Sequence, residues 1–295
     1  MSRGLDPEQI QQFHDDGFLI VRGLLPREAL QPLIDELEGK VDDATREAVR
    51  RGLLDGTDLF SEAPFGTRLA LVSGACSDPH WLWQQVHGKR HKTAGMFTLR
   101  TWPALLDVAE SLIGAEILAH PQTILRVKLP EQEETVVPWH QDLAYLRPEE
   151  AGETLIVNFW IPLVKAYAEN GCMQVIRGSH RAGLLPHDHR VSLYVGVAEA
   201  DLPDGEIVTC ELDVSDVLMT TERMVHRSIP NTSSTVRWSL DTRYSRIGLP
   251  TGRSQKPGFV ARSRENPERV ARSHHDWIKL YTEAGLDWTE TKTHR

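Results

Sequence analysis

The chain is 295 residues long, carries a formal net charge of −9 and contains 40% hydrophobic and 25% charged residues. This length lies near the upper limit for one hydrophobic core, so we expect a single domain over residues 1–295 that is large enough to enclose a pocket. The negative charge opposes binding to phosphate backbones, which depends on clustered Lys and Arg, so we expect no nucleic-acid partner.

Membrane and disulfide-rich classes are also disfavoured. No apolar run approaches the roughly 18 residues that cross a bilayer, and the first residues lack the apolar core of a signal peptide. Cys76, Cys172 and Cys210 are an odd number of cysteines without metal or redox spacing. We therefore expect a cytoplasmic protein with no membrane partner.

The first part of the chain has the pattern of helices around one strand. Pro7 opens an expected helix over residues 7–15, and an apolar strand follows over 18–21. Residues 28–52 and 102–113 repeat apolar side chains at helical spacing, which is typical of amphipathic helices packed on a larger body. We expect residues 1–115 to form a helical buttress.

The pattern then changes to short β-type runs separated by turn residues. Asn170 and Gly171, which both tolerate positive φ, predict a hairpin between two of these runs. Many short strands favour a barrel or two-sheet sandwich, so the fold class is mainly β with flanking helices, with its core over about 116–246. The polar extension 247–295 carries one expected helix, 275–284, and is a candidate lid. The expected strands are 117–129, 154–163, 172–177, 191–198, 206–212, 216–221 and 235–244.

His-x-Asp pairs are the first chemical signal, because residues two apart in a strand share a face and can present both side chains to one point. The first of the three pairs ends an amphipathic helix, and the third has no strand after it to supply a further ligand. The second follows a β-rich run and precedes the rest of the expected sheets, so it is the predicted start of a metal site. The three pairs are His14/Asp16, His140/Asp142 and His274/Asp276.

Such a site needs a third ligand from a later strand, and His226 stands between two expected strands. Two imidazoles and one carboxylate that leave open positions are the arrangement expected of iron(II) oxygenases. The alternative for His226 is a buried histidine with satisfied hydrogen bonds. His180, His187 and His189 lie in a Gly/Pro/Asp loop, where a zinc site would lack a third soft ligand.

Polar and apolar side chains alternate in the segment 236–244, which places Arg237, Ser239, Asp241 and Arg243 on one face of a strand. A guanidinium is planar and permanently charged, so it binds a carboxylate through two hydrogen bonds in a way that Lys cannot. If this face points into the barrel rather than to water, Arg237 is placed to bind an acidic co-substrate. Asp241 and Arg243 then become candidates for contact with substrate.

With these features the chain resembles the phytanoyl-CoA dioxygenase family of iron(II)/2-oxoglutarate-dependent oxygenases, over about residues 5–246. The segment 5–23 is similar to the family's N-terminal helix and strand. The segment 169–180 is similar to its central hairpin, although Arg177 stands where the family usually has Pro. The resemblance implies a double-stranded β-helix, the jelly roll of cupin-like proteins, which agrees with the strand pattern.

The resemblance also implies cofactors and residue roles. Fe(2+), 2-oxoglutarate and O2 would act together to give succinate, CO2 and, most simply, a hydroxylated substrate; desaturation, epoxidation and ring formation stay open. Gln122, Trp160 and Ser228 stand where family members approach the co-substrate. The family's metal triad falls on His140, Asp142 and His226, and its carboxylate-binding arginine falls on Arg237.

Two other functions stay open on the same scaffold. A cupin-type metal enzyme that does not use 2-oxoglutarate would give Arg237 no role, and a non-catalytic jelly-roll binding protein would not need an intact triad.

The candidate walls or lids of a substrate pocket are the stretch 81–100, the loop 131–138 and the tail after residue 246. The negative charge gives no reason to prefer a large polyanion such as an acyl-CoA, so we expect a small or medium-sized organic metabolite as substrate. The sequence does not predict the oligomeric state.

Overall fold

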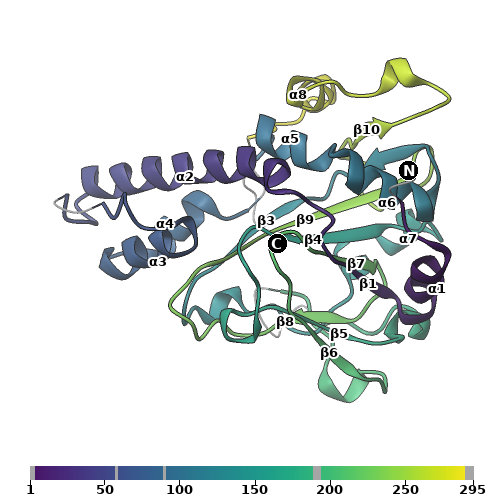
Figure 1. Cartoon of the computed structure of the whole chain (residues 1–295), viewed down its shortest axis with the longest axis horizontal. Coiled ribbons are helices and arrows are strands. Elements are labelled where there is room, and N and C mark those ends of the chain that lie inside the picture. Colours follow the sequence, from purple (N-terminus) through teal and green to yellow (C-terminus); the bar gives the residue numbers. More distant parts are fainter. Residues whose placement is uncertain (1–3, 57–58, 89–90, 189–193, 290–295) are drawn as a thin grey trace.

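The computed structural model of the protein describes residues 4–56, 59–88, 91–188 and 194–289 (Figure 1). Two antiparallel sheets form the jelly roll, and helices α2, α5 and α6 lie over the outer face of the larger sheet. The α-helices are α1 (Pro7–Asp16), α2 (Arg27–Arg50), α3 (Phe65–Ala75), α4 (Pro79–Val86), α5 (Ala94–Arg100), α6 (Pro103–Ile113), α7 (Pro148–Ala151) and α8 (His274–Glu283).

The larger sheet has the strand order β1-β7-β4-β9-β2-β10, with β3 also paired to β9, and the smaller sheet has the order β6-β5-β8. This arrangement confirms the predicted jelly roll with flanking helices. The strands are β1 (Phe18–Val21), β2 (Ile117–Ala119), β3 (Ile124–Lys128), β4 (Val157–Pro162), β5 (Met173–Ile176), β6 (Ile207–Cys210), β7 (Val217–Thr221), β8 (His226–Ser228), β9 (Arg237–Arg246) and β10 (Phe259–Arg262).

Local sequence signals define the ends of the first helix. The Asp6 carboxylate accepts a hydrogen bond from the Gln9 backbone N–H at 2.8 Å, and Pro7 occupies the first turn. Gly17 ends α1 with a φ of 79°, a left-handed conformation that glycine adopts without strain. The chain therefore turns sharply from α1 into β1, which pairs with β7 at the edge of the larger sheet.

The main hydrophobic core lies between the helices and the outer face of the larger sheet. Leu30, Leu33 and Leu37 form the buried stripe of α2 in this core, and each contributes roughly 1.5–3 kcal/mol when fully buried. Trp238 and Leu240 of β9 pack against the same core. Because side chains alternate along a strand, the polar residues of β9 are directed to the opposite face, between the two sheets.

The hairpin predicted at Asn170 and Gly171 is wrong. β4 pairs with β7 and β9 in the larger sheet, whereas β5 pairs with β6 and β8 in the smaller one. Gly171 does adopt a φ of 83°, as the sequence indicated. A turn residue determines the local backbone direction but not the partner of the following strand, and here the turn carries the chain from one sheet to the other.

Other expected elements are corrected as well. Of the expected strand 191–198, residues 191–193 lie outside the described residues, and 194–198 contain only an isolated bridge from Gly196 to Asp188. The expected strand 117–129 is divided into β2 and β3 around Pro121, which has no N–H to donate. The C-terminal extension contains β10 as well as the expected helix, and β10 extends the larger sheet beside β2.

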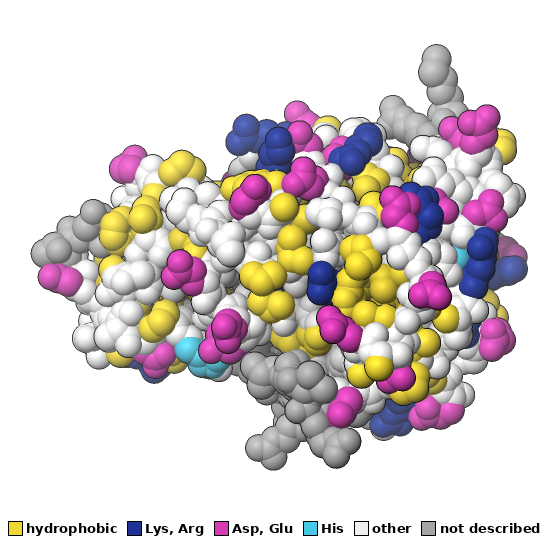
Figure 2. All heavy atoms as spheres, turned by 90° about the horizontal axis from the view of Figure 1, so that it is seen from below, with side chains coloured by type: hydrophobic (Ala, Val, Ile, Leu, Met, Phe, Trp, Pro, Cys, Tyr) yellow, Lys and Arg dark blue, Asp and Glu magenta, His cyan; other side chains and the backbone are white. Residues whose placement is uncertain are grey.

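The surface agrees with the overall composition. On the face shown in Figure 2, Lys and Arg side chains occur in small separate groups next to Asp and Glu, so the described part of this face has no broad basic area. Among the helices within the described ranges, none is both long enough and apolar enough to cross a bilayer.

Candidate metal centre

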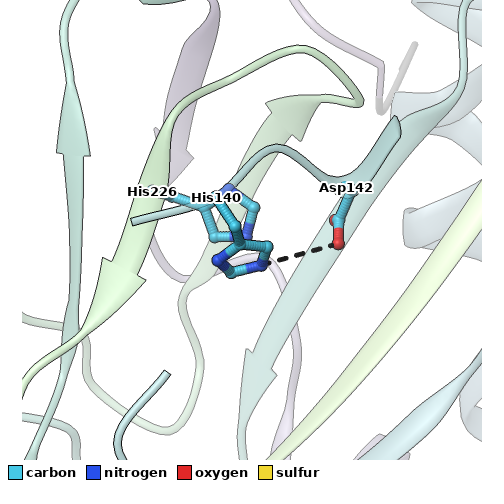
Figure 3. A group of neighbouring side chains, drawn as sticks. All are labelled: His140, Asp142 and His226. Carbon is cyan, nitrogen blue, oxygen red and sulfur yellow. Dashed lines mark ion pairs between the residues drawn. The ribbon is translucent and has the colours of Figure 1, made fainter. Parts of the chain in front are cut away.

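His140 and His226 lie opposite each other across an isolated antiparallel bridge, and each backbone N–H donates to the other residue's carbonyl at 3.0 Å. His226 begins β8 of the smaller sheet, and His140 precedes a short 3-10 turn that starts at Asp142. The two imidazole centroids are 4.1 Å apart, and Figure 3 shows the rings side by side with the Asp142 carboxylate facing them. The backbone pairing thus brings together side chains that are distant in sequence.

Hydrogen bonds orient both imidazoles for metal binding. His140 Nδ1 lies 2.9 Å from the Pro138 carbonyl, and His226 Nδ1 lies 2.9 Å from the Met224 carbonyl. A carbonyl can only accept, so each Nδ1 carries the proton and each Nε2 keeps a lone pair for a metal. Burial, followed by the nearby His226, lowers the pKa of His140 and keeps its ring neutral.

Asp142 is buried and held by two donors. Arg243 Nη2 lies 2.7 Å from its Oδ1, and Asn158 Nδ2 donates to its Oδ2 at 2.6 Å. Burial by itself raises the pKa of this carboxyl, but the Arg243 guanidinium, with smaller contributions from His226 and His140, holds the pKa well below its usual range. The group is therefore an ionised carboxylate with a defined orientation.

One ligand atom from each of these three side chains lies within 4.8 Å of the other two, and no other such group of His, Cys, Asp and Glu occurs among the described residues. His140 Nε2 and Asp142 Oδ1 are 3.9 Å apart. Two neutral imidazoles and one carboxylate are a donor set that suits iron(II), and small side-chain rotations would bring all three into contact with one ion.

A cavity of about 430 Å³, including the open space at its mouth, contains these ligands. The predicted residues Arg237, Trp160, Ser228 and Asp241 all line the same cavity. The polar face of β9 therefore points into the jelly roll and not to water, which was the alternative. The expected co-substrate residues and the metal ligands share one compartment, with the exception of Gln122.

Arg237 is almost fully buried in this cavity and is held on two sides. Its Nε donates to the Gly171 carbonyl at 3.2 Å, and its Nη1 donates to Ser239 Oγ at 2.7 Å. Its guanidinium lies 5.4 Å from the centre of the Trp160 ring. Burial lowers its pKa to about 10, so the group stays charged at neutral pH, and its Nη2 has no hydrogen-bond partner among the described residues.

The two residues predicted to contact substrate have other partners in the structure. Asp241 lines the cavity and forms an ion pair with Arg126, whose Nε lies 2.8 Å from Asp241 Oδ2. Arg243 is engaged with Asp142 and also donates from Nη1 to the Gln122 carbonyl at 3.4 Å. Direct contact of either side chain with substrate stays a prediction.

Gln122 does not line the metal cavity. It lies in the wall of a second cavity, beyond Arg243, and the backbone carbonyl rather than the side chain contacts that arginine. Its role as a co-substrate contact also stays a prediction. Ser228, by contrast, is at the metal cavity, where its Oγ accepts a hydrogen bond from the Val137 N–H at 3.2 Å.

Sequence reasoning missed Lys128 and Asn158. Lys128 lies directly opposite Arg237 in the β3 and β9 register, is 1% exposed and lines the metal cavity. Burial, then Arg237 and Arg126, lowers its pKa to about 6. The sequence does show cations alternating at Arg126 and Lys128, as they do at Arg237 and Arg243. It does not show that the strand with Lys128 pairs with the strand that carries Arg237.

Residues of the other His-x-Asp pairs and of the histidine-containing loop have structural partners. Asp16 forms an ion pair with Arg177, and Asp276 caps α8 by accepting from the Ser273 N–H. His187 Nε2 accepts a hydrogen bond from the Gln141 N–H at 3.0 Å, so it is not positioned as a free ligand. His189 lies outside the described residues.

Comparison with known proteins identifies the family. Residues 13–239, more than half of the chain, match the sequence model for phytanoyl-CoA dioxygenase (PhyH). The chain belongs to the phytanoyl-CoA dioxygenase family. It is accordingly a 2-oxoglutarate-dependent dioxygenase whose cofactors are Fe(II), 2-oxoglutarate and O2, and the His-Asp-His group has the composition that such an enzyme requires.

Relatives within and near the phytanoyl-CoA dioxygenase family include proteins from animals and bacteria. Phytanoyl-CoA dioxygenase domain-containing protein 1 of Bos taurus is 28% identical over 198 residues, which are 61% of this chain and 67% of the relative. The 1-deoxypentalenic acid 11-beta-hydroxylase of Streptomyces arenae is 26% identical over 255 residues, 81% of each chain. The apo structure of the non-heme monooxygenase ThoJ has a TM-score of 0.62 at 23% identity, over 94% of this chain and 96% of that one, and shares the fold.

Proposed function

We propose that the protein hydroxylates a small or medium-sized organic metabolite, with iron(II) bound by His140, Asp142 and His226 and with 2-oxoglutarate converted to succinate and CO2. The observation that carries this proposal is that a buried, charged arginine, Arg237, lines the same cavity as the three candidate ligands. A buried cation without a carboxylate partner is costly, and a bound diacid would provide that partner.

Each residue then has a defined task. The Nε2 atoms of the two histidines and the Asp142 carboxylate would hold the ion and leave coordination positions open. Arg237, with Lys128 opposite it, would bind the distal carboxylate of 2-oxoglutarate, and Trp160 would cover one face of the guanidinium. Bound iron(II) supplies the activation of dioxygen that is coupled to decarboxylation of the 2-oxo acid.

The relatives support hydroxylation of a metabolite rather than another outcome. The Streptomyces arenae relative is named for the 11-beta-hydroxylation of 1-deoxypentalenic acid, and it matches this chain over most of both lengths. The position of Arg237 argues against a cupin-type metal enzyme that does not use 2-oxoglutarate, because such an enzyme has no use for a buried guanidinium beside the ion. The ionised Asp142 carboxylate and the two oriented imidazoles argue against a non-catalytic binding protein.

Uncoupled turnover tests this function without knowledge of the substrate. Purified protein supplied with iron(II), 2-oxoglutarate and O2 should form succinate slowly, and His140→Ala or Asp142→Ala should abolish this formation. His14→Ala is the matched control, because His14 is exposed on α1, belongs to another His-x-Asp pair and should not affect the rate. Normal succinate formation in the two triad variants would refute the assignment.

A further inference from the structure

A second cavity lies between the C-terminal extension and the connection from β2 to β3. It encloses about 800 Å³, including the open space at its mouth, and is lined by Gln122, Lys92, Arg253, Lys256, Trp277 and Tyr281 among others. In Figure 1, α8, which carries the two aromatic residues, lies beside α5 above the larger sheet. The lining thus combines cations from two separate segments, around residue 92 and over residues 253–256, with an aromatic surface.

The cations of this lining lack carboxylate partners. Lys92 is 8% exposed, and its Nζ donates to the Trp288 carbonyl at 3.2 Å and lies 4.1 Å from the centre of the Tyr281 ring. Arg253 Nη2 donates to the Tyr145 carbonyl. Within the described ranges, Lys92, Arg253 and Lys256 make no ion pair. The one carboxylate of the lining, Asp287, is exposed, and its charge favours the charged form of Lys92. This concentration of positive charge in a protein of net charge −9 favours an anionic ligand.

Buried polar atoms in the same wall also lack partners. Arg253 Nε, Trp277 Nε1 and Gln122 Oε1 are each buried without a hydrogen bond, although Trp277 is only 1% and Gln122 only 8% exposed. Two of these atoms are donors. A half-turn of the Gln122 amide would present its Nε2 as a third donor, since the two orientations of an amide differ only in their hydrogen bonds. Donors of this kind favour a ligand that carries an acceptor-rich group such as a carboxylate.

Arg243 connects this cavity to the candidate metal centre. Its Nη1 donates to the Gln122 carbonyl at 3.4 Å, and its Nη2 lies 2.7 Å from Asp142 Oδ1. Thr123, also in the lining, donates from Oγ1 to the Asp241 carbonyl at 2.9 Å, and Asp241 lines the metal cavity. The two cavities therefore have the start of β3 and the polar face of β9 in common as a dividing wall.

We propose that the second cavity binds the carboxylate of an organic acid whose aromatic or apolar body packs on Trp277 and Tyr281, at a site that the dividing wall separates from the metal cavity. This site depends only on the cavity and not on the proposed function. Lys92, Lys256 and Arg253 supply the charge and the donors for the carboxylate. Leu286 and Pro121 complete the apolar part of the lining.

Binding of fluorinated acids tests this site. The probes are arylalkanoic acids of increasing chain length, beginning with 3-(4-fluorophenyl)propionate, together with the methyl ester of each, observed by 19F NMR line broadening without iron(II) or 2-oxoglutarate. We expect the acids to be broadened and the esters not. Lys256→Met and Gln122→Glu should each weaken acid binding by about tenfold, because the first removes a cation and the second places a negative charge in the cavity.

Two controls separate this site from others. Lys279→Met removes an exposed lysine of α8 that pairs with Glu283 outside the lining, and Arg237→Met removes the cation of the metal cavity; acid binding should survive in both. Equal broadening of acids and esters, no broadening of any acid, or loss of binding in Arg237→Met would overturn the proposal. Lys256 is exposed, so its variant remains informative if Gln122→Glu fails to fold.

Turnover tests the separation of this site from the metal centre. With iron(II), 2-oxoglutarate and O2 added, an acid that binds should be recovered unchanged while the protein still forms succinate. Recovery of the acid with one added oxygen atom would show that the ligand reaches the metal centre and would overturn a separate site. Loss of succinate formation with retained acid binding would instead overturn the proposed function and leave the binding site standing.

Discussion

Arg243 Nη2 lies 2.7 Å from Asp142 Oδ1, and both side chains are buried. This ion pair holds the carboxylate ionised and, together with Asn158, defines its orientation toward the two histidines. Groups that contact a metal ligand from behind commonly change metal affinity by about 10- to 100-fold when they are removed. Arg243 therefore acts on the metal centre through Asp142.

Replacement of this arginine should weaken metal binding. We expect Arg243→Met to lower the affinity for iron(II), measured by anaerobic titration, by about 10- to 100-fold. Arg243→Lys should recover part of the loss, because it restores the charge but not the planar geometry. Arg246→Met is the matched control on the exposed end of the same strand, and equal affinity in the Arg243 and Arg246 variants would contradict this role.

Arg237 should govern the affinity for 2-oxoglutarate and not for metal. Loss of a charge-assisted, bidentate contact to a buried carboxylate costs about 2–5 kcal/mol, so Arg237→Met should raise the Kd for 2-oxoglutarate at least about 30-fold. The affinity for iron(II) should stay within about twofold of the parent protein. Arg227→Met on β8 of the smaller sheet, where the side chain donates a hydrogen bond to Gln174, is the control. An unchanged Kd in Arg237→Met would assign the diacid to another cation of the cavity.

Because the amine of Lys128 is buried in the metal cavity, we expect 2-oxoglutarate binding to depend on pH. In the free protein its pKa is held at about 6 by burial and by Arg237 and Arg126, so the amine is mostly neutral at neutral pH. A bound diacid favours the ammonium form and raises that pKa. Binding therefore takes up a proton, and affinity should fall as the pH rises above about 6 until the amine is also neutral in the complex.

Calorimetry in buffers of different ionisation enthalpy measures this uptake directly. Lys128→Met should remove the proton uptake and flatten the dependence of Kd on pH between about 6 and 8, while Arg237 still binds the diacid. A parent protein that binds 2-oxoglutarate without proton uptake in this range would show that Lys128 does not approach the ligand.

Gly171 should be essential for stability and for the cavity. It has a φ of 83°, and an added Cβ would lie 2.6 Å from Lys128 Cδ and 2.7 Å from the Ile229 carbonyl oxygen. Strain and overpacking together should cost about 2–5 kcal/mol of unfolding free energy in Gly171→Ala. In Gly23→Ala, which has a φ of 64° and open space around the Cβ position, the cost should be only about 1–2 kcal/mol. Urea unfolding compares the two variants. Equal losses of unfolding free energy would show that the contacts of the added Cβ with Lys128 and Ile229 do not contribute.

Much of the architecture followed from local patterns in the sequence. Helix α2 was predicted from its buried stripe, and the alternation around Arg237 predicted two chemically distinct faces of β9. The β-rich surroundings of His140 and Asp142 favoured this pair among three with the same spacing, and the structure places the pair beside His226. These features are local because the periods of helices and strands repeat within a few residues.

The pairing of the strands was harder to predict from the sequence. The turn at Gly171 was recognised, yet the sequence suggested a hairpin where the chain changes sheets. Lys128 was missed because its importance depends on the register that places it opposite Arg237. Gln122 was placed with the co-substrate, whereas it lies in the connection between β2 and β3, in the wall of the second cavity.

By itself the sequence determined the fold class, the alternating faces and the identity of the residues that carry charge or can bind a metal. Three features depend on the tertiary structure instead: His226 pairs with His140, Arg243 contacts Asp142, and cations from two distant segments line one cavity. Local periodicity sets the direction in which a side chain points. Which groups meet there depends on the packing of strands and helices far apart in the chain. The net charge of −9 is a sum over the whole sequence, whereas a charge acts over a few ångströms, so a negative protein can contain a positive cavity.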